Sequence, residues 1–396
     1  MPPMYLNRDY KPRRRSKGAW RLWPLYLLIL VAILVYEQWD GRDSEGSWLF
    51  QSMRGPTPTA TLGAVNFLAD AQTAQITGDF DGSLEALARV VALDPSNADA
   101  FIELSRLHLI FQDIPKALEE AQRAFELAPD DPEALNTLAR ALDWSGDYEQ
   151  ALDRALDSLD IDAENATTLA VLAEIYTDVG SWETADTYIN QALAVDPRNV
   201  LALRNKGYLL ERQGAYTEAV AAYQQAVEVA PNRFDLYIEK ARQYRVGLED
   251  FEAAIAAYQE AVNVYRSAIT LDALGDGQYI AGDFLSAVRT LREAVDLDPT
   301  YAPAQVHMGM ALFSRRNYED SAAAFEVGLP VLGESARVEQ FYRAGMANVL
   351  KDPPNCQRAY HWFDKVLERD EGNADAIEGK GFCVENAAAT PTPEGD

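Results

Sequence analysis

The sequence has few of the residues on which metal and redox chemistry depends. Its 396 residues include two cysteines, three histidines and six methionines. His108, His307 and His361 are far apart, and neither a His-Glu-x-x-His nor a Cys-x-x-Cys pattern occurs. Metal centres need clustered His, Cys or carboxylate ligands at defined spacing. The sequence therefore predicts no metal, no cofactor and no catalytic residue, and we expect a protein that is not an enzyme.

Basic residues are also scarce. The chain holds 35 lysines and arginines against 62 aspartates and glutamates, for a net charge of −27. Residues 1–21 contain seven of the basic residues and only one acid, so the remainder is even more acidic than the whole. Nucleic acids are bound by basic surfaces. We therefore expect no nucleic acid among the partners, and we interpret the acidity chiefly as a well-solvated outer surface.

Long apolar runs are absent except near the N-terminus. No charged residue occurs from Leu22 to Tyr36, and the twenty residues from Trp20 to Trp39 can form about 30 Å of helix. Tryptophans at both ends suit the two membrane interfaces, and the basic residues before the run indicate a cytoplasmic N-terminus. A cleaved signal peptide is the alternative, with Ser44-Glu45-Gly46 as the nearest small-x-small pattern.

These features predict the arrangement of the N-terminal region. Residues 1–21 form a basic cytoplasmic segment, residues 22–39 a transmembrane signal-anchor helix, and residues 40–60 a linker rich in Gly, Ser, Pro and Thr. The rest of the chain is then extracytoplasmic, and the protein is a single-pass protein of the cell membrane.

The remainder of the chain is repetitive. The segment "GDFDGSLEALARVVALDPSN" at 78–97 returns as "GDFLSAVRTLREAVDLDPTY" at 282–301, a separation of 204 residues, or six periods of 34. Such a period is typical of repeat arrays. Steps of 34 give a mostly glycine column: Gly78, Gln112, Gly146, Gly180, Gly214, Leu248, Gly282 and Arg316. The register slips once, near "GLEDFEAA", which we interpret as a one-residue insertion.

Each repeat has the pattern of two helices. Apolar residues recur at steps of three, four and seven, which favours helices rather than strands. Small residues occupy two fixed places, where they allow two helices to approach closely. One column is Ala71, Ser105, Ala139, Ala173, Gly207, Ala241, Gly275 and Gly309; the other is Ser83, Ala117, Ala151, Ala185, Ala219, Ala254, Ala287 and Ser321. Prolines after the second helix mark its end.

The spacing of Leu138-Ala139, Leu142, Gly146, Tyr148 and Ala151 resembles that of the tetratricopeptide repeat family. The resemblance implies an all-α, right-handed superhelical solenoid of about nine helix pairs over residues 61–385. The units start near 64, 98, 132, 166, 200, 234, 268, 302 and 338. A capping helix is expected at 373–385, since an uncapped array exposes its core. The tail, 386–396, has no core-forming residues and is predicted to be disordered.

The two cysteines are predicted to lie near each other. Cys356 begins the second helix of the ninth unit, and Cys383 lies near the end of the capping helix. If these helices are antiparallel with a turn near Glu371, the two residues differ in height by no more than about 5 Å. We therefore hypothesise a disulfide bond. Two small buried thiols are the alternative.

The resemblance also implies a binding groove lined by the first helix of each pair. The family's groove positions correspond here to a set of polar residues: Arg106, Asn136, Arg140, Arg204, Asn205, Tyr208, Arg242 and Arg245. Arginine forks suit carboxylates, which favours an acidic peptide or a C-terminal carboxylate. Tyr208 stands where the carboxylate-binding members often have Asn, so the pattern is incomplete. The alternative is that these arginines pair with the groove acids Asp99, Glu103, Glu174 and Glu239.

The sequence thus predicts a membrane-anchored, non-enzymatic scaffold that binds protein partners, in the assembly of a cell-envelope complex. One alternative is binding of an envelope carbohydrate polymer by groove aromatics such as Tyr208, Tyr279 and Phe313. Another is a structural spacer that self-associates.

Overall fold

The computed structural model describes residues 62–389. The chain divides into two units, residues 1–59 and 60–396, and all of the described residues belong to the second. The predicted cytoplasmic segment, membrane span and linker lie outside the described residues. Among the helices that are described, none combines the length and apolarity needed to cross a bilayer.

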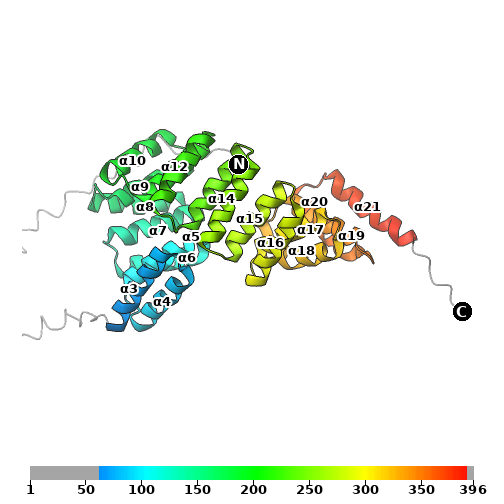
Figure 1. The fold of residues 1–396 in the computed structure, drawn as a ribbon, viewed down its shortest axis with the longest axis horizontal. Coiled ribbons are helices and arrows are strands. Elements are labelled where there is room, and N and C mark those ends of the chain that lie inside the picture. The colour runs from blue at the N-terminus through cyan, green and yellow to red at the C-terminus, as the bar shows by residue number, and fades with distance from the viewer. Residues whose placement is uncertain (1–61, 390–396) are drawn as a thin grey trace, which may run out of the picture. The chain divides into compact units, whose positions relative to one another are not determined.

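The described chain is built from α-helices arranged as successive antiparallel pairs (Figure 1). The first five pairs are α3 (Leu62–Thr77) and α4 (Phe80–Leu93), α5 (Ala98–Ile110) and α6 (Ile114–Leu127), α7 (Pro132–Ser145) and α8 (Tyr148–Ile161), α9 (Ala166–Asp178) and α10 (Trp182–Val195), α11 (Val200–Arg212) and α12 (Tyr216–Val229). The next four are α13 (Phe234–Arg242) and α14 (Phe251–Val264), α15 (Ala268–Ile280) and α16 (Phe284–Leu297), α17 (Ala302–Ser314) and α18 (Tyr318–Leu332), α19 (Val338–Leu350) and α20 (Cys356–Arg369). The final helix is α21 (Ala374–Ala389).

Local chemistry explains where the pairs turn. Gly146 ends α7 with a φ of 88°, a left-handed conformation that glycine adopts without strain. The next residue, Asp147, caps α8 by accepting a hydrogen bond from the backbone N–H of Gln150. The same left-handed turn is made without glycine by Gln112 and Arg316, with φ values of 60° and 62°. What these positions share is therefore the left-handed backbone conformation and not the glycine residue itself.

The one-residue slip in the repeat becomes a π-helical turn, Gln243–Gly247, at the end of α13. The backbone N–H of Leu248 bonds to the carbonyl of Gln243, five residues earlier, so the turn holds one more residue than an α-helical turn. The left-handed conformation therefore occurs one residue later than the repeat predicts, at Glu249, with a φ of 52°. A Cβ on Gly247 would lie 2.0 Å from the Tyr216 ring, so this insertion also brings the backbone close to the preceding unit.

The two columns of small residues lie where the helices of a pair cross. Ala139 and Ala151 are fully buried between α7 and α8. At Gly207 an added Cβ would come within 2.9 Å of the Tyr223 ring, and at Gly309 within 2.9 Å of the Phe325 ring. Small residues therefore allow close packing of each pair, while neighbouring large side chains fill the core.

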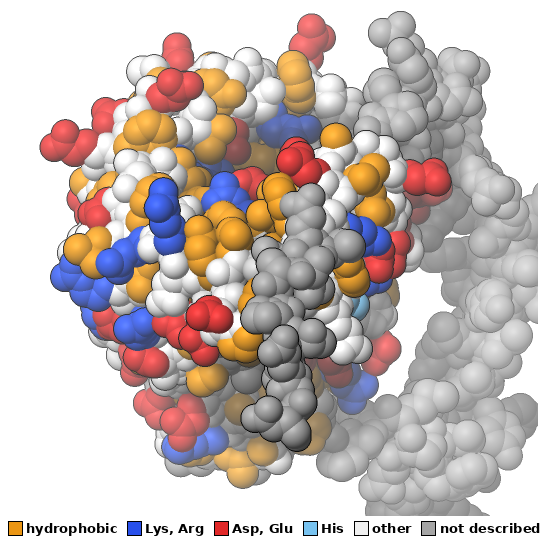
Figure 2. Space-filling model, turned by 90° about the vertical axis from the view of Figure 1, so that its right-hand side faces the viewer, with side chains coloured by type: hydrophobic (Ala, Val, Ile, Leu, Met, Phe, Trp, Pro, Cys, Tyr) orange, Lys and Arg blue, Asp and Glu red, His pale blue; other side chains and the backbone are white. Residues whose placement is uncertain are grey.

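Residues 302–389, α17 to α21, form a region that we call the capped end. Its core holds Phe325, Phe341, Trp362 and Phe363, and α21 packs against both helices of the ninth pair. Figure 2 shows this side of the molecule, with hydrophobic, acidic and basic side chains intermixed. The predicted cap, 373–385, is too short, because α21 continues to Ala389. Its last residues are alanines, the best helix formers.

We call a second region the closed segment. It consists of residues 62–265, which contain α3 to α14 and end at Tyr265. Here the first pair contacts the sixth. The Phe80 ring lies 5.2 Å from the Phe234 ring and 5.1 Å from the Tyr265 ring, between ring centroids. Phe111 joins the cluster at 6.0 Å from Phe80. The Tyr265 hydroxyl donates to Asp81 Oδ1 at 2.8 Å. We call this set of interactions the closing contact.

The closing contact explains an anomaly in the repeat. Two residues after each left-handed turn comes an apolar or aromatic residue, and Phe80 is the first of these. Its counterparts Tyr148 and Trp182 are 39% and 40% exposed, whereas Phe80 is 2% exposed. In a simple solenoid each repeat contacts only its neighbours. The closed segment departs from that rule, because packed aromatic rings bring two distant pairs together.

Candidate functional site

The first helices of six consecutive pairs, α5 to α15, surround a cavity of about 470 Å³. Its apolar lining includes Leu109, Ile110, Trp144, Val200, Leu201, Phe234, Ile238 and Ile269. Its charged lining is Arg106, Glu133, Arg140, Arg204, Arg233, Asp235, Glu239 and Arg242. Such a mixture of apolar walls and a few convergent polar groups is typical of ligand sites.

A buried ion network crosses one side of this cavity. Glu174, which is 1% exposed, accepts hydrogen bonds from Arg140 Nε at 2.9 Å and Trp144 Nε1 at 2.9 Å. Arg204 bridges Glu174 and Glu239, with nitrogen–oxygen distances of 2.5 Å to each. Burial alone would raise the pKa of Glu174, but the charges of Arg140 and Arg204 outweigh it and lower that pKa to about 2. The network is therefore ionised and internally paired.

Other predicted groove residues are also engaged within the fold. Arg106 pairs with Glu103 and Glu133, and Arg245 pairs with Asp276 at 2.7 Å. The alternative that groove arginines pair with groove acids therefore describes Arg106, Arg140 and Arg204, through Glu103, Glu174 and Glu239.

The predicted polar groove residues Asn136 and Asn205 are buried between neighbouring units. Asn136 donates to Thr168 Oγ1 at 3.0 Å, and Asn205 donates to the carbonyl of Ala170 at 2.9 Å. Both side chains are less than 2% exposed. They hold adjacent repeats together, and Asn136 also lies in the wall of the large cavity.

Arg242 differs from the other predicted groove arginines. It lines the cavity from the end of α13. Within residues 62–389, no carboxylate forms an ion pair with it and no hydrogen bond engages its guanidinium group. It is only partly buried. A guanidinium facing a cavity without an internal partner can bind a carboxylate of another molecule through two parallel hydrogen bonds.

A smaller pocket of about 250 Å³ lies beside the ion network. We call it the Asp143 pocket; it is lined by Asp143, Trp144, Tyr148, Glu174, Asp178, Arg204 and Tyr208. Asp143 is 3% exposed, and neither of its carboxylate oxygens has a hydrogen-bond donor within the described residues. Tyr208 donates its hydroxyl to Asp178. Burial first, and then the charges of Glu174 and Asp178, raise the pKa of Asp143 to about 9.

The aromatic residues proposed for carbohydrate binding are dispersed. Tyr208 bonds to Asp178, the Tyr279 ring packs on Phe284 at 5.6 Å, and Phe313 packs on Tyr318 at 5.4 Å. None of the three lines the large cavity. The aromatic residues that do line it are Trp144 and Phe234.

Phe234 and Trp144 line the cavity but were not among the predicted site residues. Phe234 is the first residue of α13, and the first residues of α5, α7 and α9 are Ala98, Pro132 and Ala166. Phe234 is thus an aromatic residue at a position where these other units have Ala or Pro. This difference could have indicated the closing contact. Trp144 carried no comparable signal, because its role depends on Glu174 in the next unit.

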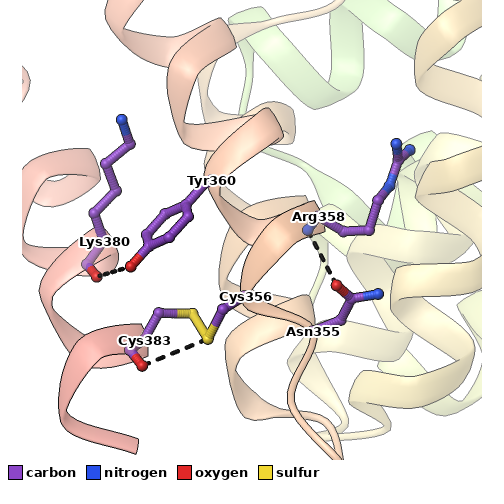
Figure 3. The surroundings of a disulfide bond; sticks show 6 residues. All are labelled: Asn355, Cys356, Arg358, Tyr360, Lys380 and Cys383. Carbon is purple, nitrogen blue, oxygen red and sulfur yellow. Dashed lines mark hydrogen bonds between the residues drawn. A yellow bond between two sulfur atoms is a disulfide. The ribbon is translucent and has the colours of Figure 1, made fainter. Parts of the chain in front are cut away.

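The two cysteines are bonded at the capped end. Cys356 and Cys383 form a disulfide between α20 and α21, with their Cα atoms 5.5 Å apart (Figure 3). The hydroxyl of Tyr360 also donates to the carbonyl of Lys380 at 3.4 Å. The hypothesis based on helix register therefore agrees with the structure, in which the bond joins the capping helix to the last repeat.

Comparisons with known proteins agree on the type of repeat. Models of the tetratricopeptide repeat match residues 76–141, 171–233 and 273–334. A Hordeum vulgare protein named "Probable UDP-N-acetylglucosamine–peptide N-acetylglucosaminyltransferase SPINDLY" is 25% identical over 136 residues. This similarity covers 34% of the present chain but only 12% of the barley protein.

Two solved structures were compared with this chain, both at low sequence identity. A chain of the APC/C hetero-tetramer Cut9–Hcn1 superimposes with a TM-score of 0.58 at 15% identity, over 81% of the present chain and 63% of that chain. A tetratricopeptide repeat protein from Parabacteroides merdae ATCC 43184 gives a TM-score of 0.41 at 16% identity, over 63% of the present chain and 99% of its own. The likeness to the first shows the fold, an all-helical superhelical solenoid.

Proposed function

Because this chain is a tetratricopeptide-repeat protein, we propose that it is a non-enzymatic scaffold whose large cavity holds a segment of a partner polypeptide. Repeats of this kind commonly mediate protein–protein interaction. The observation that carries the proposal for this chain is Arg242, the predicted groove arginine that faces the cavity without a carboxylate partner in the described residues. An acidic side chain or a C-terminal carboxylate of the partner supplies the missing charge.

The cavity chemistry supports a peptide rather than a small anion alone. Apolar side chains such as Ile238 and Ile269 lie beside the charged ones. They can bury apolar side chains of the segment, which contributes about 25 cal/mol per Å² of apolar surface. The carboxylate then determines the orientation of the segment, and the apolar contacts add affinity.

The location of the scaffold is the second part of the proposal. Residues 22–39 anchor the chain in the cell membrane, and the repeats lie on the extracytoplasmic side, where the partner belongs to a cell-envelope assembly. This part rests on the apolar run and on the basic residues before it. A tagged full-length chain is expected to stay with membranes after an alkaline wash, and a chain without residues 1–39 is not. Release of the full-length chain by the wash would exclude the anchor.

Binding is tested with the full-length chain extracted in mild detergent. Proteins captured from solubilised membranes are compared for the unmodified chain, Arg242→Glu and the control Arg289→Glu, which changes an exposed arginine of α16. A partner that uses the cavity is lost with Arg242→Glu and kept with Arg289→Glu. Its acidic segment, made as a labelled peptide, should bind Arg242→Glu at least roughly tenfold more weakly, as a lost charge-assisted hydrogen bond predicts. Equal binding to both variants would exclude the cavity.

A further inference from the structure

We propose that the Asp143 pocket is a binding site for a cationic group, the ammonium or guanidinium of a basic side chain presented by a partner polypeptide. The large cavity is proposed to attract a carboxylate; the Asp143 pocket attracts the opposite charge. The inference does not depend on what occupies the large cavity.

The charges around the pocket are unbalanced. Arg140 and Arg204 are the basic residues of the network, and they pair with Glu174 and Glu239. Two positive charges therefore meet two negative charges. Arg212, the other arginine nearby, is exposed and does not line the pocket. Asp143 adds a carboxyl group with no basic partner of its own in the described residues.

Asp178 is the second surplus acid. It accepts one hydrogen bond, from the neutral Tyr208 hydroxyl, and no ion pair involves it within residues 62–389. Asp143 and Asp178 face each other as two carboxyl groups, so they can share a hydrogen bond only when one of them holds a proton. The Asp143–Asp178 pair therefore needs either a shared proton or another cation to offset the repulsion between its two carboxylates.

Leaving Asp143 ionised and alone is energetically costly. An ionised carboxylate without a hydrogen bond or counter-ion is strongly destabilised in a buried place. Asp143 lines the pocket together with Asp178, which is less buried than Asp143. A cation entering the pocket would contact Asp178 and interact with Asp143 behind it.

The aromatic lining suits such a group. The guanidinium carbon of Arg204 already lies 5.5 Å from the Trp144 ring centre and 5.3 Å from that of Tyr208. Tyr148 lines the same pocket and is 39% exposed. Aromatic faces attract cations. Trp144 and Tyr208 already face Arg204, so Tyr148 is the ring that would meet an added cation. A volume of about 250 Å³ is small, which fits the end of a side chain better than a folded element.

Cation binding should be linked to proton release. The charged and titratable groups near Asp143 are Arg140 on α7, Tyr148 on α8, Glu174 and Asp178 on α9, and Arg204, Tyr208 and Arg212 on α11. With a pKa of about 9, Asp143 holds a proton in the free protein at neutral pH. A bound cation displaces that proton, so affinity should rise between pH 6 and pH 8, by at most about tenfold per pH unit.

The test is direct titration of the full-length chain at low ionic strength. The probes are the peptide acetyl-Gly-Lys-Gly-amide, the same peptide with an acetylated lysine, and butylammonium. We expect saturable binding of the lysine peptide that strengthens from pH 6 to pH 8, and none of the acetylated one. Tighter binding of the peptide than of butylammonium supports a polypeptide source, and equal binding supports the same chemistry with a free amine as source.

Two variants and a control connect binding to the pocket. Asp178→Asn and Asp143→Asn should each lower the affinity for the lysine peptide at least tenfold. Asp143→Asn should also abolish the pH dependence of that affinity. Asp153→Asn changes an exposed acid of α8 and should bind as the unmodified chain does. Circular dichroism melts check that each variant is folded. Absence of saturable binding at pH 8, or equal binding by folded Asp178→Asn, would overturn the proposal and leave a proton as the occupant of the acid pair.

Discussion

The closed segment and the capped end stabilise the same repeat in different ways. In the closed segment, distant pairs meet through the aromatic rings of the closing contact, and an ion network centred on Glu174 and Arg204 lies inside. At the capped end, an apolar core is covered by α21, which a disulfide joins to the last pair. One region is closed by contacts between residues far apart in the sequence, and the other by its own terminal helix.

This difference between the two regions indicates which of them binds a ligand and which mainly stabilises the fold. Buried ion pairs contribute little net stability compared with apolar packing, because desolvation offsets their attraction. The closed segment nevertheless keeps charged groups around its cavity, where they can meet a ligand. The buried polar side chains of the capped end, such as Gln340 and Asn348, are mostly uncharged. The ring nitrogen of Trp362 donates to Glu326 at 2.8 Å. We therefore infer that ligand recognition belongs to the closed segment.

The largest expected effect comes from Arg204→Met in the closed segment. It leaves Glu174 and Glu239 without their shared counter-ion, and breaking such a buried pair costs about 3–5 kcal/mol. Urea unfolding followed by circular dichroism measures the loss. The control Arg289→Met, at an exposed site on α16, should change the free energy of unfolding by less than about 0.5 kcal/mol. A similar small loss for Arg204→Met would mean that the network is dispensable.

Phe80→Ala tests the closing contact. Removing a ring that is 2% exposed should cost about 3 kcal/mol or more. It should also speed amide exchange in α3 and α4 while leaving α19 and α20 unchanged. Trp182→Ala is the matched control, because Trp182 occupies the same repeat position but is 40% exposed. Equal effects of the two substitutions would contradict a special role for Phe80.

Cys356→Ala combined with Cys383→Ala tests the capped end. The bond closes a loop across a separation of 27 residues, and its loss should cost about 3 kcal/mol on a chain-entropy estimate. Faster amide exchange should be confined to α20 and α21. Under reducing conditions the unmodified chain should behave like the variant. Alkylation of both cysteines in denatured, unreduced protein would show that the bond is absent.

The last prediction is a pH dependence from His307. Burial alone would lower its pKa, but Asp272, at 2.8 Å from Nδ1, and the charge of Asp276 raise it to about 9. A folded-state pKa above the unfolded value of about 6.5 stabilises the fold fully below that pH. The contribution is then lost as the pH rises from 6.5 through 9. Urea unfolding at pH 6 and pH 10 should show this loss, and His307→Gln should reduce it.

Periodicity predicted most of the fold, because a helix pair depends on residues close in sequence. The turn at Gly146, the small residues Ala139 and Ala151, and the start of α20 at Cys356 all follow from spacing alone. The predicted binding residues were less reliable. Arg204 and Asn205 occupy the right columns, yet one is held by two acids and the other by a backbone carbonyl of the preceding unit. Spacing identifies a position in a repeat, but not its partner in the next repeat.

The sequence by itself determined the helix pairs, their order and the register that brings Cys356 and Cys383 together, because each rests on local propensity and short-range packing. Only the tertiary structure decided that Phe80 meets Phe234 and Tyr265, since the curvature of a solenoid is the sum of small rotations between successive repeats. It also decided which charges remain unpaired. Arg242 and Asp143 look like their neighbours in the sequence, and they differ only because of what the packing of other units places beside them.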